Sequence, residues 1–103
     1  MMIARWNIDA RFGKKQLVID AVKAWCRDIG AQIGWTPDKL RVLSGAVGAP
    51  ESAVVLEVAV EDLAALSAAW SKLASVAAHG AWSKELEPHM VSGTTRWEVL
   101  RVV

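Results

Sequence analysis

Charged and amide side chains recur at alternate positions in three stretches of the chain that otherwise alternate with apolar residues. They are Arg5, Asn7 and Asp9, then Glu57, then Arg96 and Glu98. Gathered on one covered surface, such groups can bind a polar or anionic ligand. A carboxylate among them, its pKa raised by burial, can serve as a general base. The competing interpretation is a network of ion pairs that fixes the register between two protein surfaces.

The two histidines, His79 and His89, flank a short charged segment. With Glu85 or Glu87, either of them can form a metal site or an acid–base pair. Their separation of ten residues is not a usual spacing for metal ligands, and Pro88 argues against a continuous helix between them. The alternative is two surface or loop histidines near the mouth of a pocket. We predict no metal ion and no cofactor.

Six tryptophans in a chain with no tyrosine and one phenylalanine supply most of its aromatic area. Trp70, Leu73 and Trp82, together with Met90, can wall an apolar cavity for an aromatic or polyketide-like substrate. The competing explanation is ordinary packing, in which the indoles are the bulky members of a small core. Both interpretations place these rings inside the domain.

The composition limits the classes of protein to consider. A chain of 103 residues with 53% hydrophobic and 22% charged residues is one globular domain, residues 1–103. The net charge of +1, with bases and acids interleaved, predicts no nucleic-acid partner. The single cysteine, Cys26, excludes an internal disulfide, and we expect its thiol to be buried and inert. No apolar run is long enough to span a membrane, and no signal-peptide layout is present, so we expect a cytoplasmic protein.

Alternation of side chains predicts the strands that position these groups. In residues 52–61, Val54, Leu56 and Val58 point to one side and Glu57 to the other. Similar patterns predict strands over residues 2–12, 40–46 and 94–103, although the last pattern does not settle which side faces inward.

Helical spacing of apolar residues predicts the covering elements. One helix is expected over residues 14–33, and a second is expected to begin after Asp62. An interruption at His79 and Gly80 and a short helix over residues 81–87 complete the prediction.

The element order β-α-β-β-α-β is typical of an α+β, ferredoxin-like domain. It predicts a four-stranded antiparallel sheet of order 4-1-3-2 with both helices on one face. The other face would then carry Arg5 and Glu57 beside Ile3, Val55 and Leu100. Apolar groups are unfavourable in water, and unpaired charges are costly in a dry core. A second copy that covers this face would remove the apolar groups from water and allow the charges to pair. We therefore expect a two-fold homodimer with sheets face to face.

Beyond these patterns, the sequence resembles a known superfamily. The resemblance lies in the element order and in three segments: GKK at 13–15, RVLSGAVGAPESAVVLEV at 41–58 and SGTTRWEVLRVV at 92–103. It covers nearly the whole chain and points to the dimeric α+β barrels, especially their NIPSNAP-like branch. That superfamily includes cofactor-free antibiotic-biosynthesis monooxygenases, haem-degrading enzymes and muconolactone isomerase-like enzymes. It implies a pocket between sheet and helices, or inside the barrel, without naming a reaction.

Two functions from different classes follow. The first is a structural or small-ligand-binding homodimer. The second is a cofactor-free monooxygenase- or isomerase-like enzyme acting on a hydrophobic small molecule. Its polar participants would be Arg5, Asn7, Glu57 and Arg96, with His79 as a further candidate. A module that binds a different protein is a third hypothesis, which requires an apolar patch left exposed after dimerisation.

Overall fold

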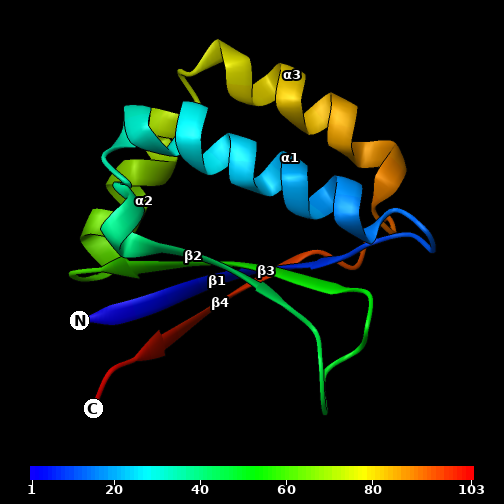
Figure 1. Ribbon diagram of the computed structural model, residues 1–103. Helices are drawn as coiled ribbons and strands as arrows, with labels where there is room; N and C mark the ends of the chain where they lie inside the picture. The colour runs from blue at the N-terminus through cyan, green and yellow to red at the C-terminus, as the bar shows by residue number, and fades with distance from the viewer.

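The computed structural model covers residues 1–103 and consists of one antiparallel sheet with helices over a single face (Figure 1). The strands are β1 (Met2–Asp9), β2 (Leu40–Ser44), β3 (Ala53–Val60) and β4 (Arg96–Arg101). The α-helices are α1 (Lys15–Asp28), α2 (Leu63–Leu73) and α3 (Ala77–Leu86). Short 3-10 helices are η1 (Gly30–Ile33), η2 (Pro37–Lys39) and η3 (Glu87–His89). None of the helices has both the length and the apolar character that crossing a membrane requires.

The strand order is β2-β3-β1-β4, which is the predicted order 4-1-3-2 read from the opposite edge. The predicted ferredoxin-like fold class is therefore confirmed. The register also answers the question that the last strand leaves open. Trp97 pairs with Trp6 and Val99 with Ala4, so these four side chains share the face under the helices.

The core lies between that face and the helices. Val54, Leu56 and Val58 of β3 are at most 2% exposed, and they pack with Val18 and Val22 of α1. Burying each such side chain contributes about 1.5–3 kcal/mol relative to leaving it in water. Because alternate residues of a strand point to opposite faces, this packing turns Glu57 away from the helices.

The helices differ from the sequence prediction in two places. The predicted interruption at His79 and Gly80 is wrong, because α3 runs through both residues. The break comes earlier, after Leu73, where the Ser75 hydroxyl donates to the carbonyl of Lys72 at 2.7 Å in place of the next helical turn. The predicted helix over 14–33 ends at Asp28 and continues only as η1.

The β2–β3 connection contains a glycine that its surroundings require. Gly45 N–H donates to the Ala53 carbonyl at 2.9 Å, and a Cβ at Gly45 would lie 1.9 Å from the carbonyl oxygen of Pro50. That oxygen belongs to the backbone and cannot swing away. Gly80, in contrast, has nothing within 4 Å of an added Cβ.

We predict that Gly45→Ala lowers the free energy of unfolding by about 1–3 kcal/mol, because the turn must shift to admit the methyl group. Gly80→Ala is the matched control and should raise it by about 0.5–1 kcal/mol, since alanine is the better helix former. Urea unfolding followed by circular dichroism measures both. A Gly45→Ala variant as stable as the wild type would contradict this description of the turn.

Candidate functional site

A row of alternating charges crosses the bare face of the sheet, the face turned away from the helices. Arg41 on β2 pairs with Glu57 on β3, Glu57 with Arg5 on β1, and Arg5 with Glu98 on β4. We call these four residues the charged row. Alternation along the chain correctly places Arg5 and Glu57 on one face, but Arg41 is missing from the predicted site. The alternation of side chains in β2 is too weak to identify Glu57 as the pairing partner of Arg41 from the sequence.

Glu57 is the centre of the charged row and is only 3% exposed. Arg5 Nε donates to its Oε2 at 2.9 Å, and Arg41 Nε donates to its Oε1 at 2.9 Å. The Arg41 Nη2 group makes a further hydrogen bond to Oε1. Both carboxylate oxygens are thus satisfied by guanidinium groups whose own side chains are partly or largely exposed.

These contacts decide the ionisation of Glu57. Burial acts to raise its pKa, but the hydrogen bonds and positive charges of Arg41 and Arg5 outweigh that effect and lower the pKa below its ordinary value. The hypothesis of a general base with a raised pKa is therefore wrong for Glu57. Its carboxylate is ionised at neutral pH and saturated by its partners, as expected of an ion-pair network.

Asn7 and Arg96 lie on the same bare face with weaker partners. The Asn7 amide nitrogen is 3.4 Å from Glu98 Oε1 and 3.5 Å from the carbonyl oxygens of Arg5 and Arg96. Arg96 makes no ion pair. Both residues line a hollow of about 310 Å³ that Val55 also lines. The structure thus brings Arg5, Asn7, Glu57 and Arg96 onto one face, and binding of a polar ligand there stays a prediction.

His79 does not join this group, because it lies in α3 on the helix side of the sheet. Trp25 Nε1–H donates to His79 Nδ1 at 3.0 Å, so the neutral imidazole carries its proton on Nε2. Burial lowers the pKa of His79 below its ordinary value, which favours this neutral form at pH 7. No cluster of three or more His, Cys, Asp or Glu side chains is arranged to hold a metal ion.

Cys26, the one thiol, is partly buried in α1. Burial raises the pKa of Cys26 to about 11, so the thiol is protonated and unreactive at neutral pH.

All six tryptophans form one continuous series of ring contacts within the helix layer and the sheet face beneath it. Successive centroids are 5.3 to 6.3 Å apart, in the order Trp35, Trp25, Trp82, Trp6, Trp97 and Trp70. The His79 ring stacks on Trp82 at 6.1 Å and meets Trp25 edge-on at 6.2 Å. Trp25 and Trp35 are therefore core residues, and Trp6 and Trp82 pack against the core, whereas Trp70 and Trp97 are exposed. Large rigid rings in such contacts also leave space between them.

That space is a cavity of about 170 Å³ between sheet and helices. Trp70 and Leu73 line it as predicted, whereas Trp82 and Met90 pack against the core instead. The other lining residues are Trp6, Trp25, Trp35, Leu56, His79, Ser83 and Trp97. We call this space the tryptophan cavity. Apart from indole N–H groups, its polar side chains are those of His79 and Ser83.

We predict that Glu57→Gln lowers the free energy of unfolding by about 1–3 kcal/mol at pH 7, because it leaves two guanidinium groups without their carboxylate. The folded-state pKa of Glu57 lies below its ordinary value of 4.5. The stabilisation is thus complete above that value and is lost as the pH falls through the lower, folded-state pKa.

Urea unfolding of both proteins from pH 7 to pH 3 checks this, and the difference between them should shrink only in the acid range. Glu61→Gln is the matched control, since Glu61 is exposed and makes no ion pair. A pH-independent difference would contradict the assigned ionisation.

Comparison with known proteins gives the fold a context. No protein-family model and no curated protein sequence matches this chain. A NIPSNAP family protein from Agrobacterium tumefaciens superimposes with a TM-score of 0.75 at 19% identity, covering 99% of this chain and 92% of that one. An uncharacterized NIPSNAP domain protein from Burkholderia xenovorans gives 0.70 at 16% identity, covering 100% and 95%.

A candidate antibiotic biosynthesis monooxygenase from Nitrosomonas europaea gives a TM-score of 0.69 at 13% identity, covering 100% of this chain and 99% of that one. At such identities the likeness concerns the fold. The chain has the ferredoxin-like fold of NIPSNAP proteins and of monooxygenase-like proteins, over its whole length, as the sequence resemblance predicts. A shared fold does not identify an activity, so the function has to be argued from the side chains at the site.

Proposed function

We propose that this protein is a homodimer that pairs through its bare sheet faces and binds a small aromatic molecule in the tryptophan cavity. One observation carries the proposal: charged groups and apolar cavity lie on opposite faces of the sheet. The saturated carboxylate of Glu57 suits an interface, whereas the cavity under the helices has the lining expected of a site for a hydrophobic ligand.

The pattern of side chains on the bare face supports the dimer. Beside the charged row runs an apolar row of Ala59, Ile3 and Leu100, with Leu100 45% exposed in a single copy. Apolar residues exposed on an open sheet face are typical of an interface. Covering them with a second copy removes them from water.

The order of charges supports one arrangement of that second copy. Across the sheet the charged row reads positive, negative, positive, negative. A two-fold axis parallel to the strands reverses this order in the second copy, so each arginine faces a glutamate. An axis across the strands would instead place like charges together, which is destabilising.

The β2–β3 connection gives further support. It extends below the sheet on the side opposite the helices (Figure 1), and Val47 within it is 99% exposed. A hairpin that projects past the bare face would flank a second copy docked there. The exposed valine would then have a surface to contact.

The tryptophan cavity supports the binding function. Its volume of about 170 Å³ suits a molecule of one or two small rings. His79 Nε2–H and the Ser83 hydroxyl supply hydrogen-bonding groups to orient such a ligand. The alternative, a cofactor-free monooxygenase- or isomerase-like enzyme, would use this same cavity with His79 as its one titratable side chain. That sparse set favours binding over catalysis, and a cytoplasmic location completes the proposal.

We predict that Leu100→Asp weakens the dimer about 100-fold, because it places a charge in the apolar row. Leu63→Asp is the matched control, since Leu63 is 56% exposed at the start of α2 on the helix side. Sedimentation velocity over a dilution series measures both. A wild-type protein that stays monomeric throughout, or an equal loss in both variants, would contradict the proposed interface.

We predict that 1-naphthol binds the tryptophan cavity and that Ser83→Leu weakens its binding about tenfold by filling the space. Ser71→Leu makes the same change at an exposed position of α2 and should leave binding unchanged. Isothermal titration calorimetry measures the affinities. Equal affinities in the two variants would contradict this site, and oxygen uptake that converts 1-naphthol to naphthoquinone and water would favour the enzyme.

A further inference from the structure

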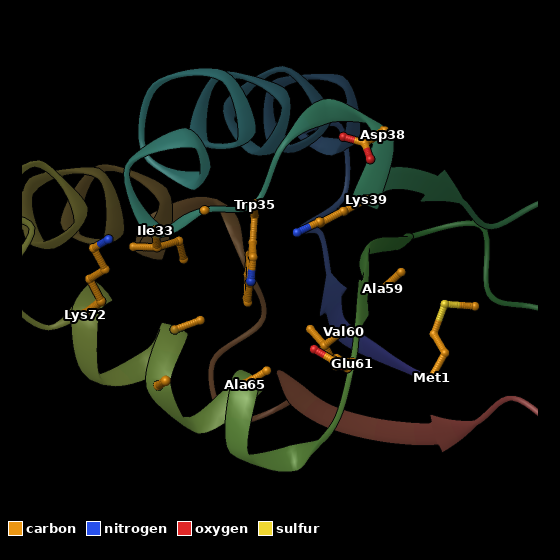
Figure 2. A pocket seen from close by; sticks show the side chains of 13 residues that line it. Met1, Ile33, Trp35, Asp38, Lys39, Ala59, Val60, Glu61, Ala65 and Lys72 are labelled. Atoms are coloured by element: carbon orange, nitrogen blue, oxygen red, sulfur yellow. The ribbon is translucent and has the colours of Figure 1, made fainter.

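A second, much larger space opens at one end of the sheet, between α2, η1, η2 and the end of β3. It has a volume of about 780 Å³, within the usual range of about 300–1,000 Å³ for ligand pockets. We call it the α2 cleft (Figure 2). Trp35 is the one residue that it shares with the lining of the tryptophan cavity.

Two features of the fold leave the α2 cleft open: the short pairing of β2 with β3, and the small side chains of α2. β2 pairs with β3 only as far as Leu40 opposite Val58, so the residues that follow Val58 have no strand beside them on that side. The helix above them presents small side chains to the space, those of Ala65, Ala68 and Ala69. Ala69 is buried in the core, whereas Ala65 and Ala68 are exposed toward the space.

Trp35 supplies an unused hydrogen-bond donor in this cleft. Its side chain is only 4% exposed, and its indole N–H has no acceptor among the hydrogen bonds of the chain, unlike those of Trp25 and Trp82. No fully buried side-chain nitrogen or oxygen lacks a partner, so this N–H must reach accessible space in a cavity. Figure 2 shows the indole of Trp35 extending into the cleft that Ala65 and Val60 also line, with its nitrogen toward the far end of the side chain.

Two lysines also line the cleft. Figure 2 shows the Lys39 ammonium group pointing toward Trp35, with Lys72 farther away beyond Ile33, and neither lysine makes an ion pair. The Asp38 carboxylate already accepts a hydrogen bond from the Thr36 hydroxyl, which together with its own backbone lowers the pKa of Asp38. Glu61 is the one carboxylate in the lining with no such partner. The lining holds two lysines and two carboxylates, so its formal charge is balanced overall. A negative acceptor is favoured locally, where the Lys39 ammonium group points toward Trp35 and its free indole N–H.

We infer that the α2 cleft is a binding site for a hydrophobic molecule that carries a carboxylate. The apolar body lies between the Trp35 ring and the alanines of α2. The carboxylate accepts hydrogen bonds from the indole N–H and from Lys39 or Lys72. This site is separate from the tryptophan cavity and does not depend on the function proposed for it.

The test is calorimetric titration of the 103-residue protein with 2-naphthoate, with neutral 2-naphthalenemethanol as the matched probe. We expect saturable binding of the anion at least about tenfold tighter than that of the alcohol. The double variant Lys39→Gln/Lys72→Gln should weaken naphthoate binding about tenfold and leave alcohol binding unchanged. Lys84→Gln, at an exposed position of α3, is the matched control and should change neither.

A steric pair of variants locates the site. Ala65→Phe fills the cleft from an exposed helical position and should abolish naphthoate binding, whereas Ala64→Phe, also exposed but outside the lining, should preserve it. Ser83→Leu, which fills the tryptophan cavity, should leave naphthoate binding unchanged, because the two sites are separate. Equal binding of anion and alcohol would overturn the inference, and so would naphthoate binding that the double variant Lys39→Gln/Lys72→Gln leaves unchanged. Loss of naphthoate binding in Ser83→Leu, or no saturable binding at all, would overturn it as well.

Discussion

The carboxylate of Glu57, buried in the middle of a sheet face that no helix covers, is the constraint from which much of the structure can be understood. A lone ionised carboxylate in such a position is very unfavourable, and it is tolerated because Arg5 and Arg41 approach from the two neighbouring strands. These contacts require β1, β3 and β2 to keep one register. A slip of one residue would turn Glu57 into the hydrophobic core and the valines toward solvent. The same pairs thus define both the order of the strands and the chemistry of the bare face.

The two faces of the sheet consequently offer different environments. On the helix side the lining is aromatic, with a neutral imidazole held by the Trp25 N–H. On the bare side, the buried Glu57 carboxylate is neutralised by Arg5 and Arg41 and has no free oxygen to offer a ligand. Arg96, Glu98 and Asp9 make no ion pair within one copy. Any polar recognition on that face is therefore expected near Arg96 and Asn7 rather than at Glu57.

Strict alternation in β1 and β3 made the sheet, its order and the placement of Arg5 and Glu57 predictable from the sequence. The signal comes from side-chain direction alone and does not depend on distant contacts. What could not be predicted depends on such contacts. Arg41 reaches Glu57 through strand pairing across a hairpin, and α3 continues through Gly80 because tertiary packing on Leu86 and Trp82 offsets the low helix propensity of glycine. The side of β4 that faces the helices likewise follows from its pairing with Trp6.

The tryptophan cavity and the α2 cleft both follow from the residue types that lie between the helix layer and the sheet. Indoles are large and rigid, and six of them in mutual contact hold the helices away from the sheet at distances that smaller side chains cannot fill. On the opposing surface, α2 presents Ala65, Ala68 and Ala69, whose methyl groups leave the gap open. An aliphatic core of similar volume could repack to close such gaps, at a cost of about 1–3 kcal/mol where the shapes fit poorly. Trp35 cannot, since its ring is held on one side by Trp25 and its N–H remains without an acceptor on the other. Trp35 thus lines both spaces, and it is the one residue that they share.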